Sequence, residues 1–147
     1  DLLPALSAVL DEMAVKVTAQ ELVKYWFEMD SRIVEPVLRD CRAARESGIS
    51  IFLATNQEHL RARYLMETLD LREEVDGIIY SAQIGLRKPQ AGFFEHAVGV
   101  SGFRPEDLLL VDDTHANVLA AVEAGWRAVH WTEGARLSAI LELAGDR

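Results

Sequence analysis

The stretch LLLVDDTHANVLAAVEAG spans residues 108–125 and joins an apolar run, two adjacent carboxylates and a helix-forming segment. The apolar residues at 108–111 predict a strand that is buried on both faces. Asp112 and Asp113 then fall at the carboxyl end of this strand, where open α/β sheets bind their ligands. Because adjacent like charges repel, the pair favours a bound cation, and hard oxygen ligands suit Mg²⁺. The alternative is a solvated loop in which an Asp caps the next helix.

From residue 34 onward, segments typical of helices alternate with segments typical of strands. The predicted strands cover residues 49–55, 77–80, 108–112 and 128–131. The predicted helices cover residues 34–46, 58–69, 90–100, 116–124 and 135–143, and the third is entered through Pro89 as a first-turn residue. Strands that alternate with helices of this length indicate βαβ units. The predicted fold is therefore α/β, with a Rossmann-like parallel sheet and helices on both faces.

Residues 1–33 differ from this pattern because they carry no strand signal. Apolar residues at helical spacing predict two helices within 1–29, and Thr18 with Glu21 three positions later predicts a capping box. We interpret 1–33 as a helical appendage and 34–147 as the α/β core. Trp26 and Phe27 on the second helix are expected to be exposed, which would suit contact with a partner such as a second copy of the chain.

Composition and charge restrict the class of partner. The 147 residues carry a formal net charge of −9, which argues against nucleic acid and anionic membrane. The single cysteine, Cys41, lies on the apolar side of a predicted helix and is expected to be a buried thiol. No apolar run has the length of a membrane span and no signal-peptide pattern is seen, so the expected compartment is the cytoplasm.

Polar side chains follow two further predicted strands. Thr55 and Asn56 close the strand at 49–55 before a helix N-terminus, a place that suits a phosphate oxygen. Lys88 follows the strand at 77–80, in a loop where Gly85 permits a close approach, and can present a compact charge to a phosphate. The alternatives are a helix cap for Thr55 and a solvated side chain for Lys88.

Asn117 lies on the helix that begins after the aspartate pair. There it can turn back toward the strand end and orient a carboxylate or a metal-bound water, although an exposed polar residue is the alternative. Thr55, Lys88 and the aspartates occur in this order, each past a strand of one parallel sheet. The topology therefore predicts that they meet in one crevice.

These segments resemble three motifs of the haloacid dehalogenase superfamily of hydrolases, in its subfamily with a small helical cap. LATNQ (53–57) is similar to the second motif, IGLRKPQAGFF (84–94) to the third, and the stretch at 108–125 to the fourth. The resemblance runs from about residue 34 to residue 131, and residues 1–33 resemble the later part of the cap. It implies that Thr55 binds the transferred phosphoryl group and that Lys88 neutralises nucleophile and phosphate. Asp113 would be a direct Mg²⁺ ligand, and Asp112 would help to hold the metal or its water.

The function implied by the resemblance is Mg²⁺-dependent hydrolysis of a small phosphorylated metabolite through an aspartyl-phosphate, as in cytosolic sugar-phosphate phosphatases. In that scheme, Thr55, Lys88 and Asp112 would be catalytic, Asn56 would contact the substrate and Asn117 would support the site.

The first motif of the family, an apolar strand that ends in D-x-D, has no counterpart in these 147 residues. Asp1 has no strand before it in this sequence. In the family that strand lies between the strands predicted here at 49–55 and 108–112, so its absence leaves a slot about 10 Å wide. Unpaired backbone groups along the slot would cost about 1–3 kcal/mol each. We therefore expect these residues to be the C-terminal portion of a longer protein, inactive alone, whose sheet is completed by an N-terminal segment or another chain.

Three other functions were weighed against the phosphatase. A catalytically inactive phosphate-binding or interaction module would keep the pocket without the nucleophile. A haloacid dehalogenase-type hydrolase is less favoured, because such enzymes tend to lack the paired aspartates seen at 112–113. A phosphoacceptor signalling domain uses similar residues but places its acidic pair before the threonine and the lysine, whereas here the pair comes last.

Overall fold

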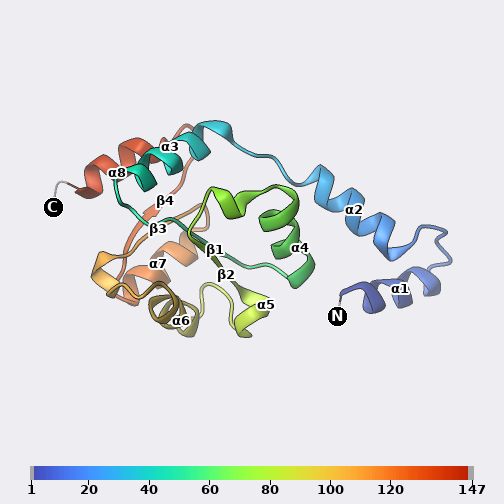
Figure 1. The fold of residues 1–147 in the computed structure, drawn as a ribbon. Coiled ribbons are helices and arrows are strands. Elements are labelled where there is room, and N and C mark those ends of the chain that lie inside the picture. The colour runs from blue at the N-terminus through green and yellow to red at the C-terminus, as the bar shows by residue number, and fades with distance from the viewer. Residues whose placement is uncertain (1, 146–147) are drawn as a thin grey trace.

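The computed structural model describes residues 2–145, and Figure 1 shows their arrangement. The helices are α1 (Leu2–Glu12), α2 (Ala19–Met29), α3 (Glu35–Glu46), α4 (His59–Arg63), α5 (Ser81–Ile84), α6 (Ala91–Ser101), α7 (His115–Glu123) and α8 (Leu137–Gly145). The strands are β1 (Phe52–Thr55), β2 (Gly77–Tyr80), β3 (Leu109–Asp112) and β4 (Arg127–His130). A π-helical turn, η1 (Tyr64–Thr68), continues α4, and two short 3₁₀ turns are η2 (Leu71–Glu73) and η3 (Pro105–Asp107). Asp1, named in the sequence analysis, lies outside the described residues.

The strands form two parallel pairs. β1 pairs with β2 so that Thr55 lies opposite Tyr80, and β3 pairs with β4 so that Asp112 lies opposite His130. Within residues 2–145, β1 and β3 each pair with a single neighbour, so each strand keeps one open edge. The predicted parallel α/β fold is confirmed.

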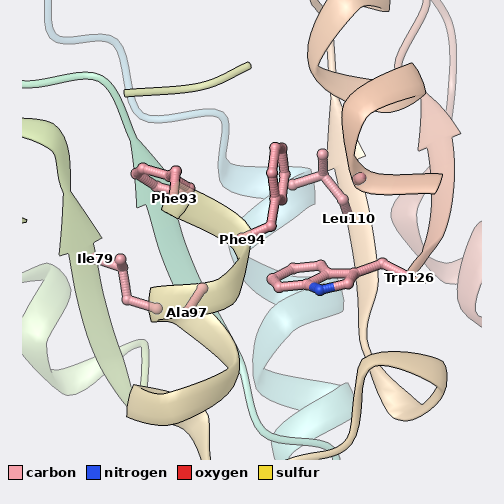
Figure 2. Packing of buried hydrophobic residues seen from close by; sticks show 7 residues of the cluster. Ile79, Phe93, Phe94, Ala97, Leu110 and Trp126 are labelled. Carbon is pink, nitrogen blue, oxygen red and sulfur yellow. The ribbon is translucent and has the colours of Figure 1, made fainter. Parts of the chain in front are cut away.

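Helices cover both faces of the strands. In Figure 1, α3 and α8 lie on one side of the strands, and α6 and α7 lie on the other. The core is centred on α6, whose Phe93 and Phe94 are fully buried. Figure 2 shows these rings between Ile79 of β2 and Leu110 of β3, so α6 bridges the two strand pairs. Aromatic burial of this kind supplies a large share of the stability of a small domain.

The N-terminal helices confirm the predicted capping box. The Thr18 hydroxyl accepts a hydrogen bond from the Glu21 backbone N–H, and the Glu21 carboxylate accepts one from the Thr18 backbone N–H. The expected exposure of Phe27 is wrong, because this side chain is only 4% exposed, whereas Trp26 is 43% exposed. The division of the chain at residue 33 stays a prediction.

Several local expectations are corrected by the structure. The helix predicted at 58–69 is α-helical only to Arg63 and then widens into η1. Pro89 is not in the first turn of α6, because Gln90 is the N-cap and the helix begins at Ala91. Gly85 does not serve a close approach, since a Cβ at this position would meet no atom within 4 Å. Its role is conformational: it ends α5, a helix the sequence analysis missed, in the left-handed region with φ of 71°.

Cys41 is buried as predicted. Burial raises the pKa of its thiol, and the charges of Asp40 and Glu74 raise it further, so the thiolate is disfavoured.

Among the helices of the described chain, none combines the length and the apolar character needed to cross a membrane.

Candidate active site at the strand ends

Lys88 and Asp112 form a buried ion pair at the carboxyl end of β3. The Lys88 Nζ donates to the Asp112 Oδ2, and each side chain is 7% exposed. A buried lysine requires a partner of opposite charge, because an unpaired charge loses its hydration without compensation. The interpretation of Lys88 as a solvated loop residue is therefore wrong.

Asp112 also accepts hydrogen bonds from the start of α7. The Asn117 Nδ2 donates to the Asp112 Oδ1 at 2.9 Å, and the Thr114 backbone N–H donates to the same oxygen at 2.8 Å. Burial raises the pKa of Asp112, but the hydrogen bonds and the charge of Lys88 outweigh it, so the pKa lies below its ordinary value. Asn117 is buried at 6% exposure, which contradicts the alternative of an exposed polar residue.

Asn56 joins the end of β1 to the loop that carries Lys88. Its side-chain oxygen accepts from the Lys88 backbone N–H at 2.8 Å, and its side-chain nitrogen donates to the Lys88 carbonyl oxygen at 2.9 Å. The two bonds hold the Lys88 backbone in one orientation beside the strand end. Thr55, the residue before Asn56, is half-buried as the last residue of β1.

Asp113 has a different environment from its neighbour. It is exposed, and its hydroxyl neighbour Thr114 approaches the Asp113 Oδ1 at 3.4 Å. Its backbone oxygen lies 2.9 Å from the His130 Nε2 at the end of β4. Asp112 is thus engaged with protein groups, whereas the Asp113 carboxylate faces solvent.

The structure links Asn56, Lys88, Asp112 and Asn117 into one hydrogen-bonded network. Thr55 and Asp113 are joined to this network through their chain neighbours, and neither side chain takes part in its hydrogen bonds. The three sequence segments therefore meet at one edge of the molecule, and the catalytic and binding roles of these residues stay predictions.

Two contacts at this edge were missed by the sequence analysis. The Ser81 hydroxyl, just past β2, donates to the Gln57 carbonyl oxygen at 3.0 Å and holds the loop after β1. Glu58 caps α4, because its carboxylate accepts from the backbone N–H groups of Leu60 and Arg61. A carboxylate just before the first turn of a predicted helix was a usable signal for this cap.

The residues present are suited to Mg²⁺ by donor type. Within residues 2–145, no group of three or more His, Cys, Asp or Glu side chains is arranged to hold a metal. Mg²⁺ nevertheless takes only one or two carboxylates in many sites and fills the remaining positions with water and substrate phosphate. The Asp113 carboxylate is exposed, whereas both oxygens of Asp112 accept hydrogen bonds from protein groups.

The structure is an α/β fold with helices on both faces of its parallel strands and a buried lysine–aspartate pair at the strand ends, which is where α/β proteins bind their ligands. The sequence pattern of the haloacid dehalogenase-like hydrolases matches residues 3–125. The chain therefore belongs to the family of haloacid dehalogenase-like hydrolases.

Individual relatives agree with this assignment. The sesquiterpene phosphatase astK of Aspergillus oryzae is 30% identical over 102 residues, which cover 69% of this chain and 51% of that protein. The chain thus spans about half the length of this curated relative.

Solved structures share the fold. An uncharacterized protein from Corynebacterium glutamicum has a TM-score of 0.67 and 26% identity, with 76% of this chain and 82% of that chain covered. A haloacid dehalogenase family enzyme from Bacteroides thetaiotaomicron, solved with magnesium and inorganic phosphate, has a TM-score of 0.78 and 17% identity, with 90% of this chain and 69% of that chain covered.

Proposed function

We propose that this chain is part of a Mg²⁺-dependent phosphatase that acts on a small phosphorylated metabolite. The observation that supports this best is the hydrogen-bonded network at the strand ends, in which Lys88, Asp112 and Asn117 are buried and Asn56 holds the Lys88 backbone. Family membership supports hydrolase chemistry, and the sesquiterpene phosphatase relative supports a phosphate ester as substrate.

Each residue has a role that follows from its chemistry. Lys88 is held in a fixed place by Asp112 and Asn56, so it presents a positive charge to phosphoryl oxygens without the cost of ordering a flexible side chain. Thr55 offers a hydroxyl to a phosphoryl oxygen at the end of β1. Asn117 and the Thr114 backbone N–H keep Asp112 ionised and oriented.

Asp113 would hold the metal directly, and Asp112 would hold it directly or through water. A bound Mg²⁺ supplies positive charge beside the phosphoryl oxygens. The open carboxylate of Asp113 and the engaged carboxylate of Asp112 support this division of roles.

The attacking carboxylate is proposed to come from a further strand between β1 and β3, supplied by an N-terminal segment or another chain. The open edges of these two strands support this, since a strand placed there would pair on both sides and end at the same edge as Thr55 and Asp112. That carboxylate would attack phosphorus and expel the leaving group to form an aspartyl-phosphate, which water then hydrolyses. The appendage of residues 2–33 would select the leaving group, and the cytoplasm stays the expected compartment.

The test is metal-dependent release of phosphate from p-nitrophenyl phosphate by the protein together with its proposed additional strand. We expect activity with Mg²⁺, loss with EDTA and a loss of at least 100-fold in Asp113→Ala. Glu46→Ala, a change at an exposed carboxylate at the end of α3, is the matched control and should retain full activity.

Two outcomes would contradict the proposal. Phosphate binding without turnover would indicate the inactive phosphate-binding module. Release of halide from a 2-chloro acid without phosphatase activity would indicate the dehalogenase-type reaction.

A further inference from the structure

Arg61 is a buried cation outside the candidate site. It is 5% exposed, although arginine is almost never fully buried unless it is paired. It lies on α4, the helix that follows Thr55 and Asn56 along the chain. A buried arginine one element away from the strand end is not used by the proposed chemistry and requires its own explanation.

The guanidinium of Arg61 caps the end of α2. Its Nη2 donates to the Asp30 carbonyl oxygen at 2.8 Å and lies 3.4 Å from the Asp30 Oδ2, and its Nη1 donates to the Phe27 carbonyl oxygen at 3.3 Å. The last carbonyls of a helix have no partner within the helix and carry its partial negative charge. Arg61, which lies on α4, therefore donates hydrogen bonds to carbonyl oxygens at the C-terminal end of α2.

Three aromatic rings surround the same guanidinium. Its central carbon lies 5.0 Å from the ring centre of Phe27, 5.8 Å from that of Trp26 and 5.9 Å from that of Tyr64. Tyr64 is the first residue of the π-helical turn, and its ring packs on Phe27 at 5.2 Å. π-helical turns often mark functional positions, and this one begins where the core meets the appendage.

We propose that Arg61 is the latch that holds the appendage, residues 2–33, on α4 and so fixes its position relative to the strand end that carries Thr55. α2 packs broadly against α1, whereas the described residues link α2 to the core through few contacts. Arg61 donates hydrogen bonds to two carbonyls of this junction and contacts three of its rings. It therefore makes a large share of the contacts between α2 and α4. Lysine would not replace it, because an ammonium lacks the planar fork and stacks less well on rings.

The first experiment follows Trp26 by ¹⁹F NMR of protein labelled with fluorotryptophan, with the resonance assigned through Trp26→Phe. In Arg61→Gln and Arg61→Lys, we expect the Trp26 resonance to move from that of a partly exposed indole toward that of a fully exposed one, and cleavage by trypsin near residues 30–34 to accelerate at least tenfold. The resonances of Trp126 and Trp131 should not move. Arg63→Gln, an exposed arginine on the same helix, is the control and should match the unmodified protein.

Two results of this experiment would overturn the latch. An unmoved Trp26 resonance in Arg61→Gln would show that the appendage stays docked without the guanidinium. Simultaneous collapse of all three tryptophan resonances would show that Arg61 holds the whole fold and not the junction.

The second experiment rests on the proposed function and uses the protein with its additional strand. In Arg61→Gln we expect the KM for 1-naphthyl phosphate to rise at least fivefold, while kcat for acetyl phosphate stays within twofold, because Lys88 and Asp112 are unchanged. An unmodified protein that hydrolyses neither ester would overturn the proposed function, and the Trp26 resonance would still decide the latch. An active protein whose KM values do not change in Arg61→Gln would overturn the latch as a positioning device.

Discussion

Lys88 and Asp112 form an ion pair in which each side chain is only 7% exposed; Lys88 lies in the loop before α6, and Asp112 is the last residue of β3. Removing one member of such a pair leaves the other as an uncompensated buried charge. The pair therefore links the stability of the fold to the integrity of the candidate site.

Lys88→Met should destabilise the protein by about 3–5 kcal/mol, because Asp112 loses its buried partner. Urea unfolding at neutral pH measures the loss. Lys88→Met combined with Asp112→Asn should cost less than the sum of the single changes, since the residues are in direct contact. Lys24→Met is the control: its pair with Glu28 is exposed, so the cost should stay below about 1 kcal/mol. If the double variant lost as much free energy of unfolding as the two single variants together, Lys88 and Asp112 would not be energetically coupled.

Asn56→Ala should release the loop that carries Lys88. The change removes two hydrogen bonds to the Lys88 backbone and should cost about 1–3 kcal/mol. Amide hydrogen exchange, resolved by residue, should show faster exchange of the Lys88 N–H. Gln90→Ala is the matched control, because it removes the bond from the Arg87 N–H to the Gln90 Oε1 in the same loop. Protection of the Lys88 N–H that survives Asn56→Ala would show that the bond is dispensable.

The fold class was predictable because local pattern and topology agree. The alternation of helices and strands requires only apolar spacing and turn residues, and the strand at Gly77–Tyr80 has the predicted bounds. The contact from Asn117 to Asp112 also has a local cause, because the helix start places residue 117 over the strand end. Capping by Thr18 is local in the same way.

Other features were not predictable because they depend on contacts distant in sequence. The bonds from Asn56 to Lys88 join loops that are 32 positions apart. Phe27 is buried against the Tyr64 ring and the Arg61 guanidinium, and an arginine is expected to be exposed until its partners are known. The change from α4 to the π-helical turn at Tyr64 has no signature in apolar spacing, since both helix types place residues 60, 64 and 65 on one side.

Phe94→Ala should be among the most damaging changes to the core. Phe94 is fully buried and packs edge to face on Trp126 at 5.6 Å and on Phe93 at 5.8 Å. The loss of buried area and the cavity left behind should cost about 3–5 kcal/mol in urea unfolding. Phe103→Ala, at a side chain that is 42% exposed, should cost less than half as much. If both changes lowered the free energy of unfolding equally, the conclusion that the core is centred on α6 would be wrong.

Asp76→Asn should change how stability depends on pH. The Ile51 backbone N–H donates to the Asp76 Oδ2 at 2.7 Å and is the main cause that lowers the pKa of this carboxyl. The hydrogen bond and the charge of Arg45 lower the pKa further, whereas desolvation of the carboxyl opposes them. A carboxyl whose pKa is lower in the folded state stabilises the protein above its unfolded pKa, which is about 3.9, and this contribution is lost as the pH falls through the lower folded value. At pH 7 the variant should therefore be less stable, by at most about 1 kcal/mol because the carboxyl is exposed and solvent screens its charge.

This difference should hold from pH 7 to about pH 4 and shrink at lower pH as the native Asp76 is protonated. Thermal unfolding of both proteins between pH 2 and 7 measures it, and comparing the two removes the effects of Asp40, Glu74 and Asp112, whose pKa values are also lowered. Asp11→Asn, at an exposed carboxylate on α1, is the matched control and should change stability by less than about 0.5 kcal/mol at every pH. A difference between Asp76→Asn and the native protein that grows as the pH falls below 4 would show that the ionised carboxylate does not stabilise the junction of β1 and β2.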